Sequence, residues 1–157
     1  MNTSKQETLV QNVSELDSQA YDRNNGEPLY TAEFVMNKEE LLEIFPPKHE
    51  NVYGDHSTNE FMPDNIDNLE DGRETEMLVI ARISDDKGDA VLVENPKSNN
   101  IHPHITISCA KETAPFYSNE MIKKALVDQD PSVKIEWIDT NTPIAIKVRE
   151  GWVAKQD

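Results

Sequence analysis

Short segments in which polar and apolar residues alternate recur along this chain, and they restrict it to a fold built mainly from β-strands. The alternation is clear in LYTAEFVM (29–36), TEMLVIARIS (75–84) and HPHITISCA (102–110). Successive side chains of a strand point to opposite faces, so each segment offers one face to a core and one to solvent or a site. The segments HSTNEF (56–61), DAVLV (89–93), VKIEWID (133–139) and TPIAIKVREGW (142–152) are also typical of strands.

Two segments follow the period of a helix instead. NKEELLEIF (37–45) starts at Asn37, a good N-cap, and Glu40 lies three residues on, as in a capping box. APFYSNEMIKKALVD (114–128) is the second expected helix. The order of strands and helices indicates two similar lobes. We therefore predict the α+β class, with a bilobal fold of antiparallel sheets covered by two helices on their outer faces.

The chain has 157 residues and a net charge of −15, with 36% hydrophobic residues. Residues 1–27 are polar and predict a tail or a marginal helix, and residues 28–157 form one predicted domain. Cys109 is the only cysteine, which leaves no disulfide framework and no cysteine-based zinc site. We expect a cytoplasmic protein, in the host cytoplasm if it is viral, because no apolar run could span a bilayer and the first residues lack the order of a signal peptide.

The acidic balance of the sequence bears on its partners. Long nucleic acids are bound mainly through Lys and Arg contacts to phosphates, and this chain has 15 such residues against 30 acidic ones. We therefore expect no long nucleic acid as a partner, and no membrane. A small anionic ligand remains compatible with the charge, because a few local donors can dominate one pocket.

The most informative motif occurs twice, as His56-Ser57-Thr58 and His104-Ile105-Thr106. On a strand, each His and its Thr project to the same side, roughly 6.5 to 7 Å apart. Two imidazoles on opposite sides of a phosphodiester can cleave it, since one removes the proton of a water or hydroxyl nucleophile and the other protonates the leaving oxygen. The two threonine hydroxyls would donate hydrogen bonds to the phosphate oxygens. This chemistry needs no metal or cofactor.

The paired motifs resemble those of the two-histidine phosphoesterase superfamily, whose members carry one His-x-Thr/Ser motif in each of two lobes flanking a cleft. FPPKHENVYGDHSTNEF (45–61) and HPHITISCAKETAPFYSNEMI (102–122) are similar to the cyclic phosphodiesterase domains of fungal tRNA ligases and to small phage and bacterial relatives. In those relatives a Pro and a Ser-Asn that begin a helix follow the second motif, matched here by Pro115, Ser118 and Asn119. The resemblance runs from about residue 29 to residue 152.

The resemblance implies catalytic roles for His56 and His104 and phosphate binding by Thr58 and Thr106. It also implies a substrate that is a small nucleotide or a short oligonucleotide. We place a 2',3'-cyclic phosphate first, and a cyclic or 2'-5' oligonucleotide signal, as in phage counter-defence, second. A stand-alone enzyme of this size is expected to be a monomer.

Other residues near the motifs have both a functional and a structural interpretation. Tyr53 and Tyr117 are the better candidates for stacking on a base, because core packing is the more frequent fate of Phe61 and Phe116. Trp152, which we expect in an exposed tail after the last strand, is another candidate for substrate binding. The further candidates for substrate binding are Ser118, beside the second motif, and Lys48, as a partner for an anion.

Three alternatives stay open at the level of sequence. His49, His102 and His104 could bind a metal, although no carboxylate or cysteine stands at a recognisable ligand spacing. Glu60, two residues after Thr58, would repel an anionic substrate unless it points away, which motivates a nucleotide-binding module without turnover. The strong acidity would also suit an interaction or inhibitor protein that acts through its surface.

Overall fold

The computed structural model describes residues 27–155. The tail predicted for residues 1–27 therefore lies outside the described residues except for Glu27. The described chain forms eight strands and two helices. The strands are β1 (Pro28–Val35), β2 (Asn51–Val52), β3 (His56–Phe61), β4 (Glu74–Ser84), β5 (Gly88–Val93), β6 (His104–Cys109), β7 (Lys134–Trp137) and β8 (Ala145–Ala154), and the helices are α3 (Lys38–Ile44) and α4 (Tyr117–Leu126).

All strand pairs are antiparallel, and the strands follow the order β2-β6-β5-β4-β8-β1-β3, with β7 paired to β4 outside this path. The sheet does not close, and with its two helices the fold belongs to the predicted α+β class. The predicted helices and long strands are all present. The short strand β2 was not predicted, because the sequence indicated a loop there.

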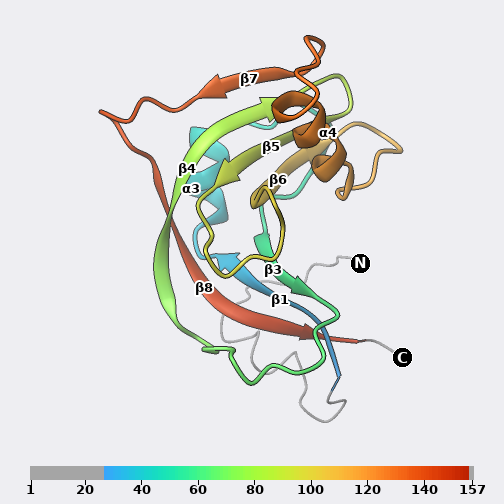
Figure 1. Ribbon diagram of the computed structural model, residues 1–157. Coiled ribbons are helices and arrows are strands. Elements are labelled where there is room, and N and C mark those ends of the chain that lie inside the picture. The colour runs from blue at the N-terminus through green and yellow to red at the C-terminus, as the bar shows by residue number, and fades with distance from the viewer. Residues whose placement is uncertain (1–26, 156–157) are drawn as a thin grey trace.

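Strand β4 divides the sheet into two lobes because its two ends have different partners. Residues 74–78 pair with β8, whereas residues 79–84 pair with β5 and, in part, with β7. The first lobe thus contains β3, β1, β8 and the start of β4, and the second lobe contains the end of β4 with β5, β6 and β2. Figure 1 shows β4 as a long curved ribbon running from one lobe into the other. Each lobe holds one His-x-Thr motif.

Helix α3 packs over the junction of the two lobes. Asn37 caps it as predicted, since its Oδ1 accepts a hydrogen bond from the amide of Glu40 at 3.0 Å. Leu41 lies in a core cluster with buried residues of both lobes. Its members are Leu41, Phe45, Met77, Val79, Val91, Val93, Ile105, Ile107, Ile146 and Val148. This shared core joins the lobes through apolar contacts.

Helix α4 covers the other face of the second lobe, opposite α3 (Figure 1). Its buried residues contact the alternate side chains of β4 and β5. Gly88 allows this close approach, because a Cβ there would lie 3.0 Å from the Tyr117 ring. His104 and Thr106 pair with Leu92 and Ala90 of β5. The second motif therefore lies on the face of the sheet that α4 covers.

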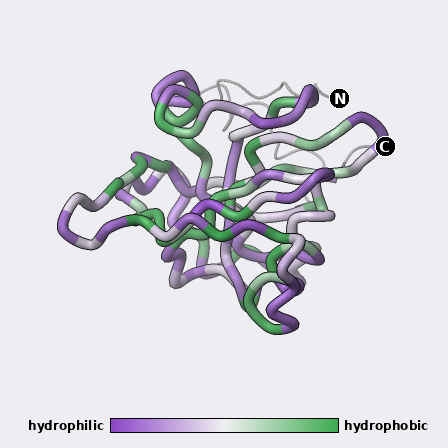
Figure 2. The backbone as a smooth tube through the Cα atoms, turned by 90° about the horizontal axis from the view of Figure 1, so that it is seen from above, coloured by the Kyte–Doolittle hydropathy of each residue, from purple (hydrophilic) through white to green (hydrophobic). Residues whose placement is uncertain are grey.

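Hydrophilic and hydrophobic stretches alternate along the strands in Figure 2, as the sequence pattern predicts. Within residues 27–155, no helix is long and apolar enough to cross a membrane.

Candidate active site

The passage of the chain from β2 into β3 brings the two motifs together. Strand β2 pairs with β6 in the register Asn51↔Cys109 and Val52↔Ser108. The pairing continues as Tyr53 N donates to the Ile107 carbonyl and Gly54 N donates to the Thr106 carbonyl, both at 2.8 Å. Continued past Gly54, the same antiparallel register would place residue 56 opposite residue 104.

Beyond this point β3 leaves β6 to pair with β1, but the two strands remain close. The change of partner occurs around Gly54, whose φ of +84° favours glycine. A Cβ at Gly54 would also lie 3.2 Å from the side chain of Leu42. The imidazoles of His56 and His104 are near enough for a charge on His104 to lower the pKa of His56. The structure thus brings together the two histidines that the sequence singled out.

His56 is held mainly by aromatic packing. Its ring stacks on Tyr30 at 5.0 Å between centroids, and it contacts Phe34 at 5.6 Å. Burial lowers the pKa of His56, the carboxylate of Asp55 raises it, and His104 lowers it, with a net decrease. Tyr30 was not among the predicted site residues. Its position is visible only through the pairing of β1 with β3, where Phe34 lies opposite His56.

His104 is held by a hydrogen bond instead. Its Nδ1 lies 2.9 Å from the carbonyl oxygen of His102, and its side chain is buried. A carbonyl can only accept, so Nδ1 carries the proton and the lone pair is on Nε2. Burial lowers the pKa of His104, the backbone hydrogen bond raises it, and the charge of His102 lowers it, with a net decrease. Both imidazoles are therefore shifted toward their neutral forms.

The two threonines have different neighbours. The Thr106 hydroxyl lies 2.8 Å from the Ser118 hydroxyl and 3.4 Å from the Pro115 carbonyl oxygen, which places it beside the start of α4. Ser118 is buried and contacts Thr106, in keeping with its expected place beside the second motif. Thr58 is half-buried, and its carbonyl accepts a hydrogen bond from Ser98 Oγ at 2.7 Å. Among the described residues, no side chain bonds to the Thr58 hydroxyl.

A β-bulge at Asn59 determines where Glu60 points. Ala32 pairs with Thr58, but the next residue along β1, Thr31, pairs with Glu60. The extra residue reverses the alternation, so Glu60 shares the face of Thr31 and not that of Thr58. Its carboxylate accepts a hydrogen bond from Asn99 at 3.3 Å. The negative charge of Glu60 is thus directed away from the motif face.

Three predicted substrate contacts have other environments. Tyr117 is the first residue of α4, and its side chain is buried against the sheet, where its hydroxyl bonds to Asp85. Trp152 does not lie in an exposed tail, because it is part of β8 and is 3% exposed. The ammonium of Lys48 contacts Ser84 at 3.2 Å and Glu136 at 3.1 Å, in the second lobe. Burial of the two aromatic rings depends on strand pairing and helix packing, which the local sequence does not show.

The exposed aromatic residues near the motifs are different ones. Phe61, three residues after Thr58, is 68% exposed, and Phe116, two residues before Ser118, is 72% exposed. Core packing was the expected fate of both and is wrong for both. Tyr53 is partly buried, and its backbone bonds to β6 immediately before the first motif. Burial raises the pKa of Tyr53, so its hydroxyl stays protonated and can donate a hydrogen bond.

The remaining histidines lie outside the pair. His49 Nε2 is 2.9 Å from the Asp85 carbonyl oxygen, and His102 supplies the carbonyl that orients His104. Within residues 27–155, no three His, Cys, Asp or Glu side chains form a group suited to a metal ion.

The comparisons with known proteins concern the fold. No protein-family profile matches the sequence, and no curated protein is similar to it in sequence. Among solved structures, the chain is similar to the crystal structure of a fungal RNA kinase, with a TM-score of 0.60 and 13% sequence identity. The match covers 82% of this chain and 46% of the kinase chain, so the protein spans less than half of that neighbour's length. The two proteins therefore share a fold over most of the chain described here.

Proposed function

We propose that this protein is a metal-independent phosphodiesterase that hydrolyses a small nucleotide phosphodiester. The observation that carries the proposal is the register of β2 on β6, which brings the start of β3, with His56, close to His104 of the other lobe. Each imidazole is followed two residues later by a threonine on the same face of its strand, so the neighbouring strands β3 and β6 carry two proton-transfer groups and two hydroxyl donors. This is the set of groups that general acid–base cleavage of a phosphodiester requires.

In the proposed reaction one imidazole accepts a proton from water while the water oxygen forms a bond to phosphorus. The second imidazole, in its charged form, donates its proton to the leaving ribose oxygen as the phosphorus–oxygen bond breaks. A cyclic phosphodiester thereby becomes a phosphomonoester with a free hydroxyl. His104 is suited to the role of base, because its protonated Nδ1 is occupied by the His102 carbonyl and its Nε2 lone pair is available. With a substrate bound in the reverse orientation, the two histidines exchange roles.

Two observations support a nucleotide as the substrate. The structural neighbour is an RNA kinase by its name, and the fold it shares with this chain supports an RNA end or a related nucleotide here. Phe61 and Phe116 expose aromatic rings beside the first and second motif, and such rings bind bases by stacking. We place a 2',3'-cyclic phosphate first and a cyclic or 2'-5' oligonucleotide second. The enzyme is proposed to act as a cytoplasmic monomer.

The alternative of a binding module without turnover depended on a repulsive carboxylate at Glu60. Because the bulge in β3 turns Glu60 to the other face, that reason no longer applies. We therefore propose an enzyme in preference to a module.

The test is a mass-spectrometric screen of 2',3'-cyclic mononucleotides, cyclic oligonucleotides and 2'-5' oligonucleotides, with EDTA present. We expect wild type to release a phosphomonoester from at least one class, and His104→Ala to release about 10²- to 10⁴-fold less. His49→Ala is the matched control, since it removes an imidazole that bonds only to the Asp85 carbonyl, and it should retain wild-type turnover. Binding of nucleotides without any turnover by wild type would contradict the proposal.

The pH dependence supplies a second test. Activity requires one neutral and one protonated imidazole, so the rate is highest between the two histidine pKa values. Burial lowers both of them below the usual 6.5. We expect a bell-shaped profile of kcat/KM whose maximum lies below pH 6.5. An optimum well above pH 7 would assign the acid–base chemistry to other groups.

A further inference from the structure

The face of β3 opposite the motif carries buried polar residues that the proposed chemistry does not use. Ser57 and Asn59 alternate with His56 and Thr58 and therefore point the other way. Ser57 is fully buried and Asn59 is 4% exposed. Buried polar groups need hydrogen-bond partners, and leaving one unpaired destabilises a fold. The identity of these partners indicates what the buried face does.

The partners come from residues 95–99, which follow β5. Asn95 Nδ2 donates to Ser57 Oγ at 3.0 Å and to Asn59 Oδ1 at 2.8 Å. Two further bonds reach the main chain of β3, from Ser98 Oγ to the Thr58 carbonyl and from Asn99 N to the Asn59 carbonyl, both at 2.7 Å. Strand β1 is the only ladder partner of β3 among the described strands. The 95–99 segment therefore supplies four additional bonds to the three residues that follow His56.

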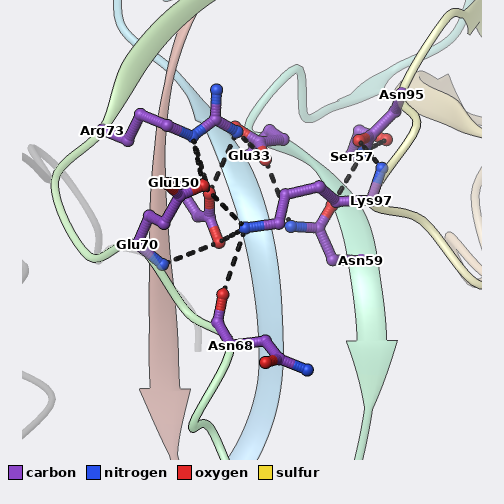
Figure 3. A network of polar contacts seen from close by, with 9 residues as sticks. All are labelled: Glu33, Ser57, Asn59, Asn68, Glu70, Arg73, Asn95, Lys97 and Glu150. Atoms are coloured by element: carbon purple, nitrogen blue, oxygen red, sulfur yellow. Dashed lines mark hydrogen bonds and ion pairs between the residues drawn. The ribbon is translucent and has the colours of Figure 1, made fainter.

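The 95–99 segment is itself anchored to the first lobe through Lys97. The Lys97 ammonium lies 2.7 Å from Glu150 Oε2 and 3.2 Å from Glu70 Oε1, as Figure 3 shows. Arg73 binds the other oxygen of Glu150 and also contacts Glu33 at 3.3 Å. Glu33 and Glu150 are each 1% exposed and are direct partners across β1 and β8. These polar contacts thus join β1, β8 and β3 through residues of the connections before β4 and after β5.

Burying the charged side chains of Glu33 and Glu150 in this lobe is energetically unfavourable. Asn59 Nδ2 donates to Glu33 Oε2 at 3.2 Å, but Glu33 Oε1 has no hydrogen-bond partner among the described residues. Burial raises the pKa of Glu33, the Asn59 bond opposes this, and the charge of Glu150 raises it further. Apolar side chains of similar volume are often as stable as buried ion pairs of this kind. The specific property that the polar groups add is directional bonding to β3.

The same connection also reaches the second motif. A few residues after Asn99, the carbonyl of His102 accepts the hydrogen bond that orients the His104 imidazole. The chain between β5 and β6 therefore contacts both histidine motifs. It bonds to Ser57, Thr58 and Asn59 of β3, and it bonds to the imidazole of His104.

We propose that the 95–99 segment, with Asn95 as its central side chain, is a positioning element that fixes His56 and Thr58 relative to His104. The proposal rests on the proposed phosphodiesterase function for its kinetic consequence, but not for its structural one. Asn95 acts through Ser57 and Asn59 and does not touch the substrate. Displacing a catalytic group by about 1 Å can cost about 10²-fold in rate, so the loss of these bonds should be visible in turnover.

The experiment compares Asn95→Leu with wild type. This substitution keeps the branched shape and the zero charge of the side chain, adds volume, and removes the amide group that donates both bonds. We expect kcat to fall by about 10- to 100-fold with KM changed less than about threefold. We also expect the NMR titration midpoint of the His56 ring to shift while that of His104 stays within experimental error, because only the first motif is released. If Asn95→Leu does not fold, Ser57→Ala removes one acceptor and should produce the same changes with a smaller size.

The matched control is Asn99→Leu, the same substitution in the same segment. The Asn99 side chain bonds only to Glu60, and its backbone bond to Asn59 is retained, so kcat and both titrations should stay as in wild type. An Asn95→Leu protein with a lower melting temperature, but with unchanged kcat and an unchanged His56 titration, would overturn the proposal and leave only a stabilising role. If wild type turns over no nucleotide, the phosphodiesterase function fails, and the His56 titration alone decides whether the segment positions the ring.

Discussion

The two His-x-Thr motifs share a sequence pattern but are held by different forces. His56 packs against the aromatic rings of Tyr30 and Phe34, and Asn95 bonds to Ser57 on the opposite face of the same strand. His104 is oriented by a carbonyl two residues away, and Thr106 by the hydroxyl of Ser118. The second motif is thus organised by its own neighbourhood in the chain, whereas the first depends on distant segments. The two motifs have the same proposed chemical role, but mutations of the residues that hold them should affect them to different degrees.

We expect the largest effect from the two histidines, and the two motifs should not differ in this effect. His56→Ala and His104→Ala should each lower kcat by about 10²- to 10⁴-fold, because each removes a proton-transfer group. Because the two groups act as a unit, the double variant should lose little more than the more impaired single variant. Single-turnover rates on the best substrate of the screen measure this. Multiplicative losses in the double variant would show that the two imidazoles act independently.

The difference between the two motifs should appear in the side chains that support the two threonines. Thr58→Val and Thr106→Val each remove a hydroxyl donor to the phosphate, and both should lower kcat by about 10²-fold. Ser118→Ala should lower it by about tenfold, because Thr106 then loses the partner that directs its hydroxyl.

The first motif offers a control for the Ser118 variant. Ser98→Ala removes a bond to the Thr58 carbonyl but none to its hydroxyl, so its effect on kcat should be smaller than that of Ser118→Ala. Equal losses in the two variants would contradict the difference between the motifs.

Removal of the ring under His56 should have an intermediate effect. Tyr30→Leu keeps an apolar side chain but removes the stacking surface, and we expect a loss of about tenfold in kcat, smaller than for a ring displaced by 1 Å. The NMR line of His56 should broaden while that of His104 does not. A change in His104 of the same size would indicate that Tyr30 supports the whole site.

The smallest effect concerns the charge of Asp55. This carboxylate raises the pKa of His56, so Asp55→Asn should lower that pKa, and the effect should be small because Asp55 is 40% exposed and pairs with Lys38. Titration of the ring protons measures the shift. With His104 as the base and His56 as the acid, the alkaline limb of the rate profile should move to lower pH with it. A pKa of His56 that rises in this variant would contradict the electrostatic account.

Local sequence patterns predicted most of the fold. The alternation in β1, β4, β6 and β8, and the Asn37 cap of α3, are properties of neighbouring residues, and they appear in the structure where expected. Strand β2 was missed because two residues carry no periodic pattern. The motif residues could be singled out because a repeated His-x-Thr on strands is itself local.

The rest of the site depends on contacts between distant segments. Tyr30 becomes a neighbour of His56 only when β1 pairs with β3, and the bulge that turns Glu60 away is a property of that pairing. Tyr117 and Phe116 are adjacent in sequence, yet one is buried and the other exposed because α4 begins between them. No property of the single residues distinguishes them, so a prediction from sequence chose the wrong ring.

The few residues around Gly54 have a consequence for how the molecule can move. Tyr53 and Gly54 are bonded to one lobe, and the Asp55 carbonyl accepts a bond from Val35 of the other lobe. Three adjacent peptide groups therefore act as a strap between the halves, immediately before the first imidazole. Any motion that separated the lobes at this point would have to break these three hydrogen bonds.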